Sequence, residues 1–177
     1  MASQLAFDQW QSTAGVVRNT VAQTLQFHYT DRWVQSPGSS TTWYDTPILV
    51  TITPRFANSK IIGMFTGVLG INYWEVQGRI IRNGTTPVQQ GDVEGSRSRA
   101  GFSMIYFDYQ STSYYNTYNI AYNFLDTPNS TSAVTYRLQL NGYSTEPFSI
   151  NGSYNFGNTL DYDGCPTSQL TIMEITQ

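Results

Sequence analysis

The chain has 177 residues, of which 40% are hydrophobic and 15% aromatic, so it is long and apolar enough for one domain with a core. Only 12% of the residues are charged and 9 are basic, so the sequence lacks the basic stripe that nucleic-acid binding needs. No apolar run reaches the roughly 20 residues of a membrane span. We therefore expect neither nucleic-acid binding nor membrane insertion.

The first residues and the cysteine content bear on the compartment in which we expect the protein to be made. The first ten residues carry no cationic segment followed by an apolar run, so we expect no signal peptide and synthesis in the cytoplasm. Cys165 is the one cysteine, which rules out an intrachain disulfide. We interpret it as a loop residue before Pro166; a bond between subunits is the alternative.

Residues 1–20 are polar and carry irregularly spaced apolar residues: Phe7, Trp10, Val16 and Val17. This pattern predicts an extended N-terminal arm, followed by one domain over 21–177. Exposed aromatic residues are unfavourable unless they dock against something. The arm therefore either anchors the protein on another protein or folds back onto its own domain.

From residue 21 onward the dominant hydrophobic period is two, which is typical of antiparallel strands with one buried face. The alternation covers 21–29, 48–52, 61–73, 114–124 and 134–140. Asn83-Gly84 predicts a tight hairpin, and Asn141-Gly142 and Asn151-Gly152 predict two further turns. About ten short strands without a helical stripe predict an all-β sandwich or barrel.

The last strand, 170–176, is apolar on both faces apart from Glu174, which predicts a central position in a covered sheet. A partner subunit is the natural cover in so small a domain. The segment 91–101 concentrates charge and predicts an ion-pair network within or between subunits. The candidate subunit-interface residues are Ile172, Ile175, Tyr118, Tyr122, Arg97 and Arg99.

Tyr114 and Tyr115 lie next to a predicted Ser/Thr-rich turn. Tyrosine combines contact area with a hydrogen-bonding tip and is enriched at interfaces. We treat the two residues as candidates for contact with a host receptor or surface glycan. The alternative is that they belong to a core or interface strand.

Catalysis has little support in the sequence. His28 is the one histidine, and no serine stands in a nucleophile-elbow motif. One histidine and one cysteine cannot form an ordinary zinc site. The segment 161–164 (DYDG) is the densest acidic spot, yet it completes neither a calcium loop nor a clear glycosidase acid pair. We expect no enzyme activity, no cofactor and no metal.

Several stretches resemble a family of small phage proteins, common in aquatic and cyanobacterial phage genomes, that are labelled tail-fibre or virion structural proteins. They are ITPRFANSKIIG (52–63), IIRNGT (80–85), GDVEGSRSRAGF (91–102), FLDTPNSTSAVTYRLQL (124–140) and SQLTIMEIT (168–176). The resemblance implies an antiparallel jelly-roll sandwich similar to the tumour-necrosis-factor and C1q heads, packed as a homotrimer on the outside of a virion. It implies no catalytic residues.

Three functions follow as expectations. The first is a trimeric short tail-fibre or receptor-binding protein that contributes to host attachment and docks on tail or baseplate proteins. The second is a capsid decoration protein whose arm clamps the major capsid protein. The absence of a heptad or other shaft repeat favours either this protein or a very short fibre whose arm docks directly on the tail. The third is a carbohydrate-active enzyme, for which no acid pair stands out.

Overall fold

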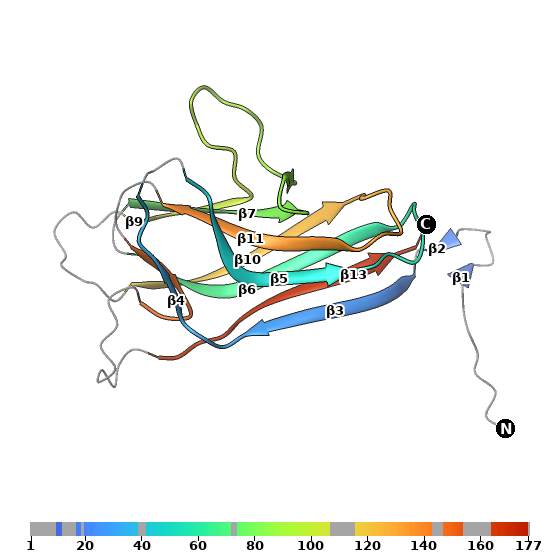
Figure 1. Ribbon diagram of the computed structural model, residues 1–177, viewed down its shortest axis with the longest axis horizontal. Helices are drawn as coiled ribbons and strands as arrows, with labels where there is room; N and C mark the ends of the chain where they lie inside the picture. The colour runs from blue at the N-terminus through green and yellow to red at the C-terminus, as the bar shows by residue number, and fades with distance from the viewer. Residues whose placement is uncertain are drawn as a thin grey trace.

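The computed structural model describes residues 10–11, 17–18, 20–38, 42–71, 74–106, 116–142, 147–153 and 164–176. All regular structure in these residues is β-strand. Two antiparallel sheets, of six and five strands, form a β-sandwich (Figure 1). The prediction of an all-β sandwich is thereby confirmed.

The six-stranded sheet is built around β6. This strand pairs with β10 on one side, and on the other with β13 and then β12; β3 lies beyond β13, and β4 beyond β12. The last strand thus has the central position that its apolar pattern predicts. The strands are β3 (Val21–Tyr29), β4 (Trp33–Gln35), β6 (Lys60–Ile71), β10 (Thr117–Asp126), β12 (Phe148–Ile150) and β13 (Ser168–Ile175).

The five-stranded sheet runs in the order β5, β11, β7, and β7 then pairs with both β8 and β9. The ladder between β5 and β11 is broken between Arg137 and Gln139 by a register shift. The Thr46 hydroxyl bridges this irregularity by donating to the Leu138 carbonyl at 2.8 Å. The strands are β5 (Tyr44–Ile52), β7 (Trp74–Arg82), β8 (Thr86–Val88), β9 (Phe102–Tyr106) and β11 (Val134–Gly142).

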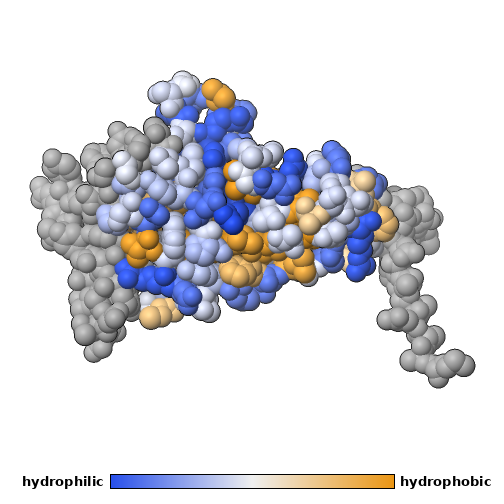
Figure 2. Space-filling model, viewed as in Figure 1, coloured by the Kyte–Doolittle hydropathy of each residue, from blue (hydrophilic) through white to orange (hydrophobic). Residues whose placement is uncertain are grey.

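The core fills the space between the two sheets with the apolar phase of each strand. Its largest fully buried side chains are Tyr136, Phe65, Phe124 and Phe148. The core reaches the surface at the edge where β3 lies against β5: Leu25, in register with buried Ile172, is 36% exposed. A band of hydrophobic residues is visible at the level of β5 and β13 (Figure 2).

The three Asn-Gly pairs, which the sequence predicts to be turns, differ in the structure. Asn83 and Gly84 both have positive φ, at 50° and 73°, in the turn that joins β7 to β8, as predicted. At Asn151-Gly152 the chain bends just after β12 (Phe148–Ile150), with φ of 61° and 145°. The prediction for Asn141-Gly142 was wrong, because these two residues are the last of β11 and pair with Gln77 and Val76 of β7.

Strands β1 (Trp10–Gln11) and β2 (Val17–Arg18) pair with each other and with neither large sheet (Figure 1). The two strands lie in the segment predicted to be an arm. The side chains of Trp10 and Val17 are outside the described part of the structure, as are Phe7 and Val16 altogether. Within the described residues, no helix is long and apolar enough to cross a bilayer.

Candidate interaction surfaces

The outer surface of the six-stranded sheet is uncharged over four neighbouring strands. Register and alternation place one phase of β3, β13, β6 and β10 on this side. We call it the uncharged face: Thr24, Gln26, His28, Gln169, Thr171, Met173, Ile62, Met64, Thr66, Val68, Thr117, Asn119, Ala121, Asn123 and Leu125. His28 is its one titratable side chain. Lys60, at the first position of β6, marks the end of the face.

The uncharged face changes character along the strands. Near Lys60 it is apolar, with Met173, Ile62 and Leu125 in one row across three strands. Leu125 is 49% exposed although it is a large hydrophobic residue. Toward the other end, Thr66 and Asn119 replace the apolar residues. A surface with an apolar part and an uncharged polar part has the composition of a protein interface, which combines an apolar core with a polar rim.

Amides and hydroxyls form a ladder on the β3–β13 side of this face. Gln26 Nε2 donates to Gln169 Oε1 at 3.1 Å and to Thr171 Oγ1 at 2.9 Å. His28 Nε2 lies 3.0 Å from Gln26 Oε1. The histidine is therefore part of a surface ladder of polar side chains, on an exposed strand, with an amide as its neighbour.

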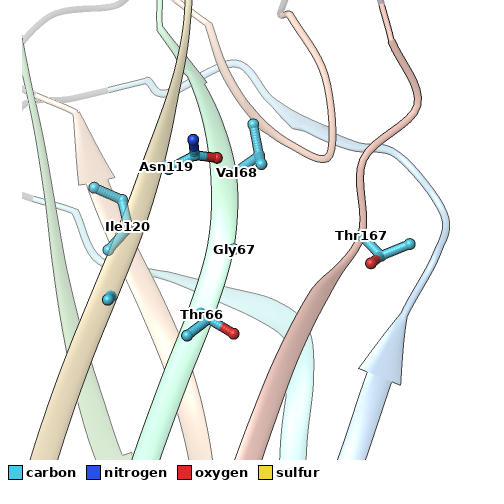
Figure 3. A pocket seen from close by; sticks show the side chains of 7 residues that line it. Thr66, Gly67, Val68, Asn119, Ile120 and Thr167 are labelled. Atoms are coloured by element: carbon cyan, nitrogen blue, oxygen red, sulfur yellow. The ribbon is translucent and has the colours of Figure 1, made fainter.

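A hollow of about 380 Å³ opens where β13 separates from β6 (Figure 3). Thr66, Gly67 and Val68 of β6 line it with residues of β10, and Thr167, just before β13, lies on its other side. Asn119 is its one amide side chain. The lining offers hydroxyl, amide and apolar groups, so the hollow suits a neutral side chain better than an ion.

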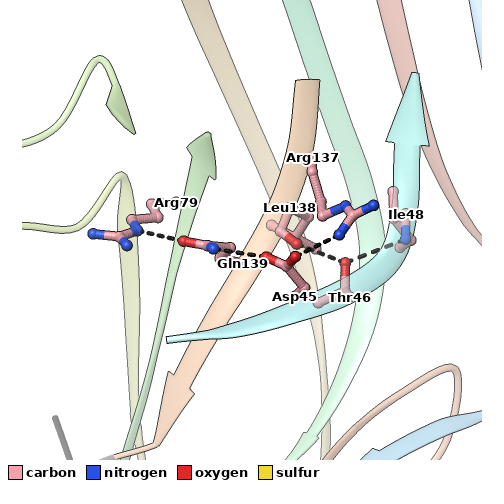
Figure 4. A network of polar contacts seen from close by, with 7 residues as sticks. All are labelled: Asp45, Thr46, Ile48, Arg79, Arg137, Leu138 and Gln139. Carbon is pink, nitrogen blue, oxygen red and sulfur yellow. Dashed lines mark hydrogen bonds and ion pairs between the residues drawn. The ribbon is translucent and has the colours of Figure 1, made fainter. Parts of the chain in front are cut away.

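The outer surface of the five-stranded sheet is charged, in contrast. Asp45 of β5 accepts hydrogen bonds from Arg137 Nη1 and, at 2.7 Å, from Gln139 Nε2 (Figure 4). Gln139 Oε1 in turn accepts from Arg79 Nε at 2.8 Å. The Arg79 guanidinium lies 4.1 Å from the ring centre of Trp43, a cation–π contact.

This network sets the protonation of its carboxylate. Burial by itself raises the pKa of Asp45, but hydrogen bonds from Gln139 and Arg137, with the charges of Arg137 and Arg79, outweigh it and lower the pKa. Asp45 therefore stays ionised and holds β5 against β11. The ion pair itself is half exposed, so it adds at most about 1 kcal/mol to stability.

Glu174 is a buried carboxylate that the sequence flagged only as an exception in an apolar strand. Its Oε1 accepts hydrogen bonds from the Arg55 amide at 2.8 Å and the Ser59 hydroxyl at 2.6 Å, and its Oε2 accepts from Gln23 Nε2 at 2.7 Å. The Phe56 amide also donates to Oε1, at 3.3 Å. Burial raises the pKa of Glu174, yet these hydrogen bonds outweigh burial and keep it below its usual range.

The loop 89–101, which contains the charged segment 91–101, stands out from the sandwich between β8 and β9 (Figure 1). Arg97 pairs with Glu94 of the same segment at 3.0 Å, and both side chains are more than three-quarters exposed. Arg99 Nε donates to the Gly91 carbonyl at 2.7 Å, so this hydrogen bond links the two ends of the charged segment. The polar contacts of both arginines thus lie within the chain, and their role between subunits stays a prediction.

Three of the other predicted interface residues lie on the inner side of their strands. Ile172 is fully buried in the core of its own chain. Ile175 is half-buried and, in register with Lys60, belongs to the outward phase of β13. Tyr118 and Tyr122 point inward from β10 and pack against the core. The Tyr122 hydroxyl donates to the Gln89 carbonyl at 2.6 Å. Tyr114 and Tyr115 lie outside the described residues.

The sequence pattern does not single out the residues of the uncharged face, because each is unremarkable alone. The signal was available in the outward phase of the alternating runs, where charge is missing over several strands. In the part of the chain that the structure describes, no three of histidine, cysteine, aspartate and glutamate gather as a metal site would need. The segment 161–163 with its two aspartates is outside that part.

A scan with protein-family models gives no match to this chain, and a search of curated proteins gives none either. The β-sandwich of two antiparallel sheets is therefore established by the structure alone. The phage resemblance is a hypothesis.

Proposed function

We propose that this protein is a structural protein of a phage virion exterior, a trimeric short tail-fibre or receptor-binding protein that contributes to host attachment. Its two sheets form a jelly roll in this proposal. The observation that carries the proposal is the strand order, and the sequence stretches that resemble phage virion proteins agree with it.

The strand order is the one a jelly roll requires. Counting β3, β5, β6, β7, β9, β10, β11 and β13 as strands one to eight, one sheet runs one, eight, three, six, and the other runs two, seven, four, five. The first strand thus pairs with the last, and the second with the seventh, as when a long antiparallel ribbon is rolled up. Jelly rolls recur in viral capsid and lectin domains, which act by assembling and binding.

The paired strands β1 and β2, outside both large sheets, support an arm that can hold a separate partner. Removing the first 15 residues leaves Thr20, whose amide lies 3.3 Å from Thr176 Oγ1, and the whole sandwich in place. We expect the truncated protein to fold, judged by circular dichroism, but not to enter particles. Incorporation of the truncated protein at the normal level would contradict the anchor role.

The location on the particle is tested by labelling and by counting copies in purified virions. A few trimers per particle at the tail are expected for a fibre. Hundreds of copies over the shell would instead support the capsid decoration protein. A protein absent from purified particles would overturn both.

A further inference from the structure

We propose that the uncharged face is the surface through which copies of this chain pack against one another. The proposal rests on the trimer in the proposed function and names the surface that holds it together. It is carried by three observations on the described residues: the contrast in charge between the two outer surfaces, the hydrogen-bonding chemistry of the face, and its relief.

The contrast in charge is the first. The outer surface of the five-stranded sheet carries Asp45, Glu75, Arg79 and Arg137, whereas the equivalent surface of the other sheet carries none between Ile62 and Val68 or on the strands beside them. Charged residues are depleted at the centre of protein interfaces because a buried charge without a partner is costly. A ligand recognised by its charge would find nothing to pair with on this face.

The second observation decides the kind of partner. Carboxylates only accept hydrogen bonds and guanidinium groups only donate, whereas amides and hydroxyls do both. The polar members of the face are almost all of the second kind, such as Gln169, Thr66 and Asn119. A surface of this chemistry can satisfy its hydrogen bonds against a copy of itself, so the occupant that fits is a second copy of the chain.

The third observation is the shape of the uncharged face. Leu125 is exposed at the apolar end of the face, and the hollow at Thr66 and Thr167 lies toward the other end. An exposed apolar side chain and a recess at different places on one surface allow different parts of the face to meet in neighbouring copies. Such a heterologous contact closes into a ring when the rotation between copies is a whole fraction of a turn, as in a trimer, whereas a face packed squarely on itself closes into a dimer.

The test places one charge on each side of the sandwich. Thr66→Glu puts a carboxylate at the centre of the uncharged face, and Thr51→Glu is the matched control, since both are exposed strand threonines. Asn119→Asp repeats the test with a nearly isosteric change. Sedimentation over a range of concentrations gives the oligomer, and circular dichroism with urea unfolding shows that each variant is folded.

We expect a wild-type trimer, at least about tenfold weaker assembly for Thr66→Glu and Asn119→Asp, and unchanged assembly for Thr51→Glu. Assembly of the folded Thr66→Glu and Asn119→Asp variants at wild-type strength would overturn the inference and leave the proposed function standing. Equal weakening by Thr51→Glu would also overturn it. A wild-type dimer that only Thr66→Glu and Asn119→Asp disrupt would support this face and contradict the trimer, and a wild-type monomer would contradict both.

Discussion

The ring of Phe124 lies over the backbone of Gly63, its partner across the β6–β10 ladder. A Cβ atom at Gly63 would stand 2.0 Å from two atoms of that ring. Phe124 is 2% exposed, so the ring has little room to withdraw. Glycine at this position thus lets a phenylalanine fill the core at the centre of the six-stranded sheet.

Gly63→Ala should therefore lower the free energy of unfolding by about 1–3 kcal/mol, the usual cost of overfilling a packed core. Urea unfolding followed by tryptophan fluorescence measures it. Gly164→Ala is the control, because no atom of the described residues lies within 4 Å of a Cβ there, and it should change stability by less than about 0.5 kcal/mol. Equal stability of the two variants would show that Phe124 moves aside without cost.

Glu174→Gln should destabilise the fold by about 1–3 kcal/mol, because a buried group that accepts four hydrogen bonds loses its charge and one acceptor oxygen. The new amide would point a donor at Gln23 Nε2, which is itself a donor. Glu94→Gln, on an exposed loop side chain, is the control and should leave urea unfolding unchanged. A Glu174→Gln variant as stable as wild type would mean that the loop at Arg55 does not depend on the carboxylate.

The same carboxylate makes stability depend on pH in a predictable direction. The folded-state pKa of Glu174 lies below the ordinary value of about 4.3, so in the range between the two the unfolded chain binds a proton that the folded chain does not. Stability is therefore complete above the ordinary pKa and is lost as the pH falls through the folded-state pKa.

Asp45 acts in the same direction, because its folded-state pKa is also lowered. Urea unfolding between pH 7 and pH 3 should show stability falling at the acid end. Glu174→Gln should make this fall shallower without abolishing it, since Asp45 remains. A slope identical to that of wild type would place the folded-state pKa of Glu174 at its ordinary value.

Many of the strands could be predicted because the alternation of apolar and polar residues is a local pattern in the sequence. The runs at 21–29 and 134–140 became β3 and part of β11. The pairing of strands could not be read in the same way, because the partners are far apart: Gln26 bonds to Gln169, 143 residues along the chain. Sequence spacing does not tell which of several apolar strands will meet.

The burial of Glu174 follows from the alternation of its strand. It follows Leu170 and Ile172 at spacings of two, so it shares their buried side. A carboxylate in that phase needs donors, and the loop at Arg55 to Ser59 supplies three of them. Which loop would do so depends on tertiary packing, and the sequence pattern holds no information on it.

Asp126 joins the two sheets, since it lies on β10 and is bound by two residues of the other sheet. Arg82 Nη1 lies 2.8 Å from Asp126 Oδ2, and the Tyr136 hydroxyl donates to the same oxygen at 2.7 Å. Tyr136 is fully buried; burial and the hydrogen bond to Asp126 both raise its pKa, so it stays a donor at neutral pH.

Tyr136→Phe should thus cost about 1.5–3 kcal/mol, the range for a hydrogen bond to a charged group. Tyr122→Phe is the matched change, because its hydroxyl donates to a neutral carbonyl, that of Gln89, and it should cost only about 0.5–1.5 kcal/mol. Urea unfolding of both variants, and of Tyr136→Phe combined with Asp126→Asn, measures the difference. Once Asp126 is neutral, removing the Tyr136 hydroxyl should cost less than it does in wild type. Strictly additive losses would mean that the hydroxyl and the carboxylate stabilise the sandwich independently, and that the charge of Asp126 acts through Arg82 alone.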